Sequence, residues 1–354
     1  MMANKARIAM IGVDYPHASA WRESIGLMDN VELVAMAKGP FDGTAGAGAA
    51  APVLWAKGAK QKPVPTFETV DELMEKADFD GAMVMLSNAE KPDMCIRLAE
   101  AGKHVFAEKP VACSAREMER IARAVKKNGV RFSTGYTWRY HPIMTTVRDR
   151  IEAGEFGRLY AMQVRMLTSS VEDRGPGHFL FAKEQMGSGM VGWLGCHPID
   201  IMLFFFNQKV KSITGKVSHI GEPKVSVEDG GTAVLEFEDG ALATLICGFY
   251  LKKFYGETLY SLQGTNAWAD WTGTPANLRY MRKDMKGPQV EDHDLPKIGG
   301  YGGQVALDLI NDWLDTAGTG APPRNNEDNA LRVLKVVDAI YQSSETGRRV
   351  DADI

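Results

Sequence analysis

Short apolar runs alternate with helical stretches through the first 134 residues, and this alternation constrains the fold more than any other feature. The runs lie at residues 8–11, 32–36, 81–86, 104–107 and 130–134. Strands that are apolar on both faces are typical of parallel sheets covered by helices on both sides. We therefore predict an α/β fold whose first part is a doubly wound parallel sheet. A chain of 354 residues has room for a second domain.

The segment 101–112 is the most informative of these stretches. A helix is predicted to end at Gly102, and a buried strand over 104–107 runs directly into Glu108-Lys109-Pro110. In open parallel sheets, ligands bind just outside the carboxyl ends of the strands. This position makes Lys109 the first candidate for chemistry. The alternative is that Glu108 and Lys109 form a solvated pair leading into a turn.

Together with a strand ending at Ser87-Asn88 and a helix beginning at Ser114, this segment resembles the signature of the glucose-fructose oxidoreductase, inositol dehydrogenase and MocA (Gfo/Idh/MocA) family. The resemblance implies an N-terminal Rossmann dinucleotide-binding domain, here residues 1–134. It further implies an α+β domain, residues 135–354, with a large open, mostly antiparallel sheet for substrate binding and oligomerisation. The helices predicted at 304–316 and 327–344 would pack back towards the first domain.

The first strand-turn-helix departs from the dinucleotide fingerprint. The three glycine positions of Gly-x-Gly-x-x-Gly hold Gly12, Asp14 and His17, so only the first glycine is kept. A dinucleotide is still compatible with this turn if Asp14 turns away to cap the helix that Tyr15-Pro16 opens, and His17 supplies a donor. The cofactor-binding residues expected in this turn are Gly12, Val13, Asp14, Tyr15 and His17.

The expected cofactor is NADP or NAD, with NADP slightly favoured. Lys38 stands where an acidic residue usually binds the adenosine ribose, and a cation there suits a 2'-phosphate, although a lysine after a strand is as often merely solvated. Ser87, Asn88 and Glu108 are further expected cofactor contacts, with an ordinary turn asparagine as the alternative for Asn88. Lys91 replaces a histidine of the family pattern.

In the second half, residues 136–142 resemble a family segment, and Trp138 and Arg139 are candidates for substrate binding; a packed domain joint is the alternative. A glycine-rich turn then precedes a helix that resembles the one carrying the family's catalytic Asp-x-x-x-His pair. At that spacing both side chains lie on one helix face. His197 and Asp200 match, but Trp193 replaces the catalytic Asp.

Further elements follow from local patterns. Residues 233–237 and 242–247 flank Glu238-Asp239-Gly240, which predicts a hairpin. More strands are expected at 259–263 and around 268–271. Residues 285–300 are predicted to form a loop, and the Gly- and Ala-rich residues 43–51 are predicted to be a surface insertion or a poorly specified helix.

Composition excludes several function classes. A net charge of −4 without long runs of like charge predicts no nucleic-acid partner and no anionic membrane partner. The cysteines, at positions 95, 113, 196 and 247, have neither zinc-site nor disulfide-framework spacing, which predicts reduced thiols, no metal site and a cytoplasmic protein. A small-molecule substrate and a homodimer or homotetramer are expected.

The leading interpretation is an NAD(P)-dependent oxidoreductase that transfers a hydride to or from a sugar, polyol, inositol or related hydroxy or keto compound. Lys109 would be the general acid and base, His197 would assist at the same oxygen, and Trp193 would form an apolar wall. The alternative is a non-redox ligand-binding or regulatory relative, because two glycines, the ribose carboxylate and the catalytic Asp are all altered.

Overall fold

The computed structural model describes residues 5–13, 15–39, 63–221, 223–253, 255–272, 277–293, 303–316 and 318–354. The chain divides into two compact units, Met1–Tyr140 with Pro296–Leu331 and His141–Leu295 with Arg332–Ile354. The division into a dinucleotide-binding domain, residues 1–134, and a substrate-binding domain, residues 135–354, stays a prediction. The predicted insertion at residues 43–51 lies outside the described residues.

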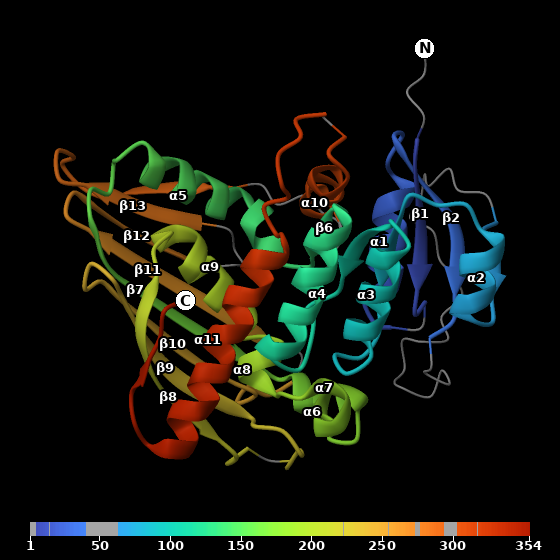
Figure 1. Ribbon diagram of the computed structural model, residues 1–354. Helices are drawn as coiled ribbons and strands as arrows, with labels where there is room; N and C mark the ends of the chain where they lie inside the picture. The colour runs from blue at the N-terminus through green and yellow to red at the C-terminus, as the bar shows by residue number, and fades with distance from the viewer. Residues whose placement is uncertain are drawn as a thin grey trace. The chain divides into compact units, whose positions relative to one another are not determined.

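The first unit is built on a six-stranded parallel sheet with strand order β3-β2-β1-β4-β5-β6 (Figure 1). Its strands and helices are β1 (Ala6–Ile11), α1 (Ala18–Gly26), β2 (Val31–Ala37), β3 (Thr66–Phe67), α2 (Val70–Lys76), β4 (Gly81–Val84), α3 (Lys91–Glu100), β5 (His104–Ala107), α4 (Ala115–Asn128), β6 (Phe132–Thr134), the 3₁₀ helix η1 (Thr137–Tyr140), α10 (Gln304–Leu314) and the start of α11 (Glu327–Thr346). This strand order is that of the Rossmann fold, and it confirms the predicted doubly wound sheet.

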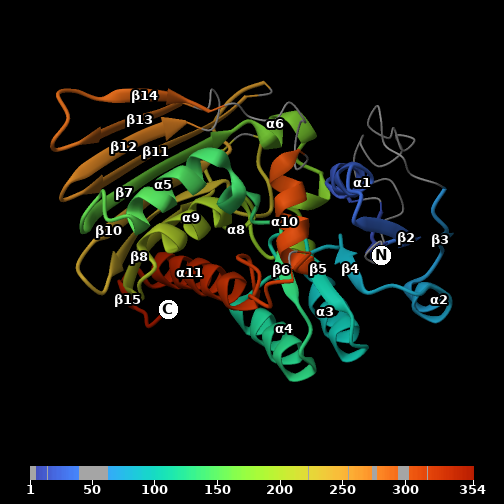
Figure 2. The same ribbon diagram turned by 90° about the horizontal axis from the view of Figure 1, so that it is seen from above.

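Local sequence explains these elements. The strand β4 is buried along its whole length, because α1 with α10 and α3 with α4 pack in pairs and cover the two faces of the sheet (Figure 2). Ser114 caps α4 by accepting a hydrogen bond from the Glu117 amide, and α4 ends at Gly129 with a φ of 63°. Thr69 caps α2 in the same way, through the Glu72 amide.

The second unit contains a nine-stranded sheet with order β14-β13-β12-β11-β7-β10-β9-β8-β15, in which only the β7–β10 pairing is parallel among the described strands. Its elements are α5 (Pro142–Glu152), β7 (Leu159–Thr168), α6 (Ser170–Arg174), the 3₁₀ helix η2 (Phe179–Phe181), α7 (Lys183–Met186), α8 (Met190–Trp193), α9 (Cys196–Phe206), β8 (Val210–Ser218), β9 (Gly230–Phe237), β10 (Leu242–Gly248), β11 (Gly256–Gly264), β12 (Ala267–Thr272), β13 (Asn277–Arg282), β14 (Gln289–Asp292), β15 (Val350–Asp351) and α11 from Arg332.

The predicted open, mostly antiparallel sheet is confirmed, and α5, α9 and α11 lie over one of its faces (Figure 2). The hairpin of β9 and β10 turns at Gly240, with a φ of 85°. The predicted loop at 285–300 is wrong over Gln289–Asp292, because β14 pairs with β13 as an edge strand. The polar sequence of β14 did not predict a strand. Residues 294–300 lie outside the described part.

Within the described ranges, no single helix is long and apolar enough to span a bilayer. One pair of helices, Lys183–Trp193 and Cys196–Phe206, is together long and apolar enough by length and composition alone, but it is bent by 48°.

Candidate active site

The carboxyl edge of the first sheet gathers the main predicted cofactor residues. Strand β1 lies between β2 and β4, and β5 follows β4, so the segments after β1, β4 and β5 meet at the topological switch point of the sheet. These segments carry Gly12, Ser87 with Asn88, and Glu108 with Lys109. The side chains of Asn88, Glu108 and Lys109 are completely buried, and Ser87 is almost so.

The turn after β1 needs a glycine at position 12. Gly12 has a φ of 85°, and a Cβ added there would lie 1.9 Å from the carbonyl oxygen of Met85. Val13 is half-buried and Tyr15 is buried, while Asp14 lies outside the described residues. Helix α1 begins at Ala18, later than the predicted start at Tyr15-Pro16.

His17, at the third glycine position, is the N-cap residue of α1, but its side chain does not cap the helix. Its Nδ1 instead lies 2.9 Å from Oε1 of Glu108, and the indole Nε1 of Trp21 donates to Oε2 of Glu108 at 2.9 Å. Burial by itself would raise the pKa of the Glu108 carboxyl. The neighbouring His17, together with Lys109 and Lys91, outweighs burial and holds that pKa below its ordinary value. Glu108 is therefore a buried carboxylate that joins the β5 end to α1.

Sequence reasoning missed Trp21, because nothing in its local pattern distinguishes an indole that donates to a carboxylate from an ordinary core tryptophan. It also left Lys91 without a role. Lys91 is completely buried, and its Nζ donates to Oδ1 of Asn88 at 2.9 Å, to the Glu108 carbonyl at 2.8 Å and to the Pro110 carbonyl. The Lys109–Pro110 peptide bond is cis.

Lys38 lies at the end of β2, as predicted, and forms an ion pair with Glu68, which follows β3. Its Nζ is 2.7 and 2.8 Å from the two carboxylate oxygens, and both side chains are largely exposed. Ser87 donates to Glu90 through its hydroxyl at 2.5 Å. The ribose end of the expected site therefore presents a carboxylate as well as a cation.

Trp138 and Arg139 lie on η1 in the first unit. Trp138 is half-buried, whereas Arg139 is buried and donates through Nη1 to the carbonyl of Arg324 at 2.8 Å. Asn325 donates to the carbonyls of Thr134 and Tyr136. These bonds hold the 3₁₀ turn on the segment that precedes α11, within the first unit.

The predicted single helix through Trp193 and His197 is wrong. Helix α8 ends at Trp193 and α9 begins at Cys196, with Leu194 and Gly195 between them. The His197 amide donates to the Leu194 carbonyl, and the Cys196 thiol lies 3.2 Å from the Trp193 carbonyl, so the α-helical bond from residue 197 to residue 193 is replaced. A Cβ on Gly195 would lie 2.5 Å from the Val191 carbonyl, which explains why this tight turn needs glycine.

Trp193 lies in a buried aromatic cluster. Its ring centroid is 6.0 Å from Phe181 and 5.9 Å from Phe249, and the Arg174 guanidinium lies 5.9 Å from the indole. The indole is only 3% exposed, and its role as an apolar pocket wall stays a prediction. His197 and Asp200 are also buried, on the first two turns of α9.

Glu228 organises the glycine-rich turn before α8 and was not anticipated from the sequence. Its carboxylate accepts from the amides of Gly189 and Val191 at 2.7 and 3.0 Å and from the Tyr341 hydroxyl at 2.7 Å. Burial raises the pKa of Glu228, against the lowering effect of these bonds. Gly189 is required here, since a Cβ would lie 2.0 Å from the Glu228 carbonyl. The turn is thus fixed by a partner far along the chain.

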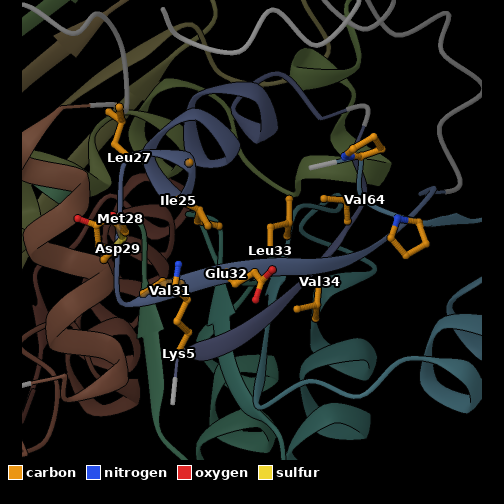
Figure 3. A pocket seen from close by; sticks show the side chains of 13 residues that line it. Lys5, Ile25, Leu27, Met28, Asp29, Val31, Glu32, Leu33, Val34 and Val64 are labelled. Atoms are coloured by element: carbon orange, nitrogen blue, oxygen red, sulfur yellow. The ribbon is translucent and has the colours of Figure 1, made fainter. Parts of the chain in front are cut away.

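A hollow of about 440 Å³ in the first unit lies away from these residues (Figure 3). It is lined by the end of α1, the start of β2 and the chain before β3, including Lys5, Ile25, Met28, Val31 and Val64. This is the amino edge of the sheet, opposite the carboxyl edge where Rossmann folds bind dinucleotides. Among the described residues, no three His, Cys, Asp or Glu side chains gather to hold a metal ion.

Two family models match the chain. Residues 6–136 match the oxidoreductase family with an NAD-binding Rossmann fold, and residues 144–270 match the GFO/IDH/MocA C-terminal domain.

Individual proteins agree with this assignment. An oxidoreductase of Bacillus subtilis is 27% identical over 177 residues, about half of each chain. The dTDP-3,4-didehydro-2,6-dideoxy-alpha-D-glucose 3-reductase of Streptomyces violaceoruber is 25% identical, covering 78% of this chain and 80% of its own. The structure of levoglucosan dehydrogenase in complex with NADH shares the fold, with a TM-score of 0.84, 19% identity and coverage of 99% and 100%. The chain belongs to the Gfo/Idh/MocA family of NAD(P)-dependent oxidoreductases.

Proposed function

We propose that this protein is a dehydrogenase or reductase of a sugar, polyol, inositol or related hydroxy or keto compound. The carrying observation is Lys109, completely buried at the carboxyl end of β5 beside the strand end that carries Asn88. The relatives act on compounds of this class, as their names state: a nucleotide-linked deoxysugar in one case and levoglucosan in another.

The residues at the switch point suit a dinucleotide. The turn after β1 keeps the glycine that its positive φ requires, and α1 follows it with its N-terminus towards the carboxyl edge. Gly12, Val13, Tyr15, His17, Ser87 and Asn88 are the described residues proposed to hold NAD(P), which supplies or accepts the hydride when bound. Asp14 is proposed with them on the sequence alone.

Lys109 is proposed to give a proton to, or take one from, the substrate oxygen whose carbon is reduced or oxidised. The amine suits this role because burial and a second lysine nearby disfavour a permanent positive charge. Glu108, held by His17 and Trp21, fixes the backbone from which Lys109 projects and is proposed near the cofactor. Trp138, Arg139, Trp193, His197 and Asp200 remain the proposed substrate residues, with His197 as a further catalytic group.

The cofactor preference is proposed to be for NADPH over NADH, on the strength of Lys38. The ion pair between Lys38 and Glu68 opposes a strong preference, because a 2'-phosphate would approach the Glu68 carboxylate as well. Equal affinities for the two cofactors would contradict this proposal.

A dimer or tetramer is proposed through the sheet face opposite α5, α9 and α11. Leu242 and Ile246 share one face of β10, and Val234 of β9 pairs with Thr244 between them. These three apolar side chains are 43%, 48% and 39% exposed. An apolar patch on the face of a nine-stranded sheet suits a second copy of the chain.

The direct test is binding followed by turnover. NADPH and NADH are titrated into the protein by calorimetry, and sugars, polyols, inositols and sugar acids are then screened for oxidation or reduction of the cofactor. On a substrate found this way, Lys109→Ala should lose about a hundred-fold or more in kcat/KM, the usual share of a positioned general acid or base. Lys127→Ala, an exposed lysine on α4, is the control. Failure to bind either cofactor would instead support the non-redox alternative.

A further inference from the structure

Lys91, the first residue of α3, lies next to the proposed catalytic lysine and has no assigned role. Its ammonium donates three hydrogen bonds, to Oδ1 of Asn88, to the Glu108 carbonyl and to the Pro110 carbonyl. An ammonium group has three N–H donors and no acceptor, so the three bonds use its full donor capacity. This pattern requires the charged form of Lys91.

Two of the three acceptors flank Lys109 in the backbone, one on each side. The third belongs to Asn88, which follows the neighbouring strand β4. Because the Lys91 ammonium can only donate, the Asn88 oxygen must face it, and the Asn88 amide nitrogen occupies the other branch of the planar carboxamide. One side chain therefore fixes both the backbone around Lys109 and the orientation of Asn88.

The titratable groups around Lys91 come from three segments. Glu108 and Lys109 follow β5, Cys95 lies one turn further along α3, and Cys113 precedes α4; the Tyr15 ring lies 6.0 Å away. Burial lowers the pKa of Lys91 to about 8, with Glu108 acting against burial and Lys109 with it. The two lysines thus oppose each other's charge, and the buried Glu108 carboxylate compensates.

We propose that Lys91 is a positioning residue for the proposed reaction: it holds the backbone on both sides of Lys109 together with Asn88, and its charge favours the neutral amine of Lys109. The proposal rests on the proposed function of Lys109 as acid and base. If this residue only filled space, an apolar side chain would be expected here. A buried ammonium loses its hydration, and hydrogen bonds and opposite charge must compensate that loss.

The decisive measurement uses neither substrate nor cofactor. The protein is labelled with ¹³C at lysine Cε, and the Lys109 signal, identified by its loss in Lys109→Arg, is followed against pH in the parent protein and in Lys91→Met. The midpoint of the Lys109 titration should rise by at least about half a pH unit in Lys91→Met, because a neighbouring cation is removed. A titration near pH 8 should disappear with Lys91.

Lys103→Met is the matched control. Lys103 also donates to a main-chain carbonyl, that of Phe79 at 2.8 Å, but it lies before β5 at the opposite end of the strand. Its loss should leave the Lys109 titration unchanged. If Lys91→Met fails to fold, Lys91→His replaces it: histidine keeps a donor and is uncharged above about pH 7.5, so the same rise is expected there.

A Lys109 midpoint that moves by less than about 0.2 unit in the folded variant, or equally in Lys103→Met, would overturn the proposal. Kinetics give a second readout once a substrate is known: kcat should fall about ten-fold or more in Lys91→Met with KM changed less than about three-fold, and Lys91→His should recover part of kcat. An inactive protein with the expected titration shift would refute the proposed function while leaving the interaction of the two lysines established.

Discussion

The hydrogen bond between Trp21 and Glu108 should contribute measurably to stability, and the chain offers a matched control. Trp21 and Trp313 are both completely buried in the first unit, and both pack on Phe106, with ring centroids 4.8 and 5.6 Å away. Trp21 donates to the Glu108 carboxylate, whereas the Trp313 Nε1 has no hydrogen-bond partner among the described residues. The two tryptophans therefore differ chiefly in one bond.

Replacing each by phenylalanine removes the same atoms, so the losses from packing should largely cancel in the comparison. A hydrogen bond to a charged group is worth about 1.5 to 3 kcal/mol, and Trp21→Phe should be less stable than Trp313→Phe by about that amount. At about 2 to 4 °C per kcal/mol for a unit of this size, the melting temperatures should differ by about 3 to 12 °C.

The assay is urea and thermal unfolding of both variants at pH 7 and in acid. The pKa of Glu108 lies below its ordinary value of 4.5 in the folded protein, so its stabilising effect is complete above pH 4.5 and is lost as the pH falls through the folded-state value. The difference between the variants should shrink accordingly. Equal stabilities at pH 7, or a less stable Trp313→Phe, would refute the reasoning.

Four other predictions each concern one side chain. Glu68→Ala removes the carboxylate beside Lys38 and should raise the preference for NADPH over NADH about ten-fold, measured by calorimetry. The reason is that one charged contact to the phosphate is worth about 1.5 to 3 kcal/mol. An unchanged ratio of the two affinities would show that Lys38 does not contact the phosphate. Ile246→Lys should dissociate the proposed dimer or tetramer in light scattering, and a parent protein that is already monomeric would contradict that proposal. His141 caps α5 by accepting a hydrogen bond from the Ile143 amide, and burial lowers the pKa of His141 to about 4. Its stabilising effect is therefore complete above pH 6.5 and is lost as the pH falls towards 4. The urea midpoint should fall less between pH 7 and 5 in His141→Asn, which keeps a capping oxygen, than in the parent protein. Trp193→Asp buries a carboxylate in an aromatic cluster and should lower the melting temperature well beyond the loss in Trp193→Phe. Equal losses would mean that water or the nearby Arg174 compensates the charge.

Most of the first sheet could be predicted because its signals are local. A strand buried on both faces is apolar along its length, and a helix start such as Ser114 needs only the amide three residues on. The position of Lys109 after β5 also followed from local pattern, since strand ends at the switch point share one edge. The sequence by itself thus determined the Rossmann architecture and the strand end at which Lys109 lies.

Only the tertiary structure decided how the site is held together. Trp21 reaches Glu108 across 87 positions, and Tyr341 reaches Glu228 across 113, and neither pairing leaves a periodic trace in the sequence. The break between α8 and α9 arises where Gly195 lies against the Val191 carbonyl, so a helical spacing that predicted one continuous face was overridden by packing. Periodicity and capping report bonds within a few residues, whereas a buried charge such as Lys91 is defined by partners that folding brings to it.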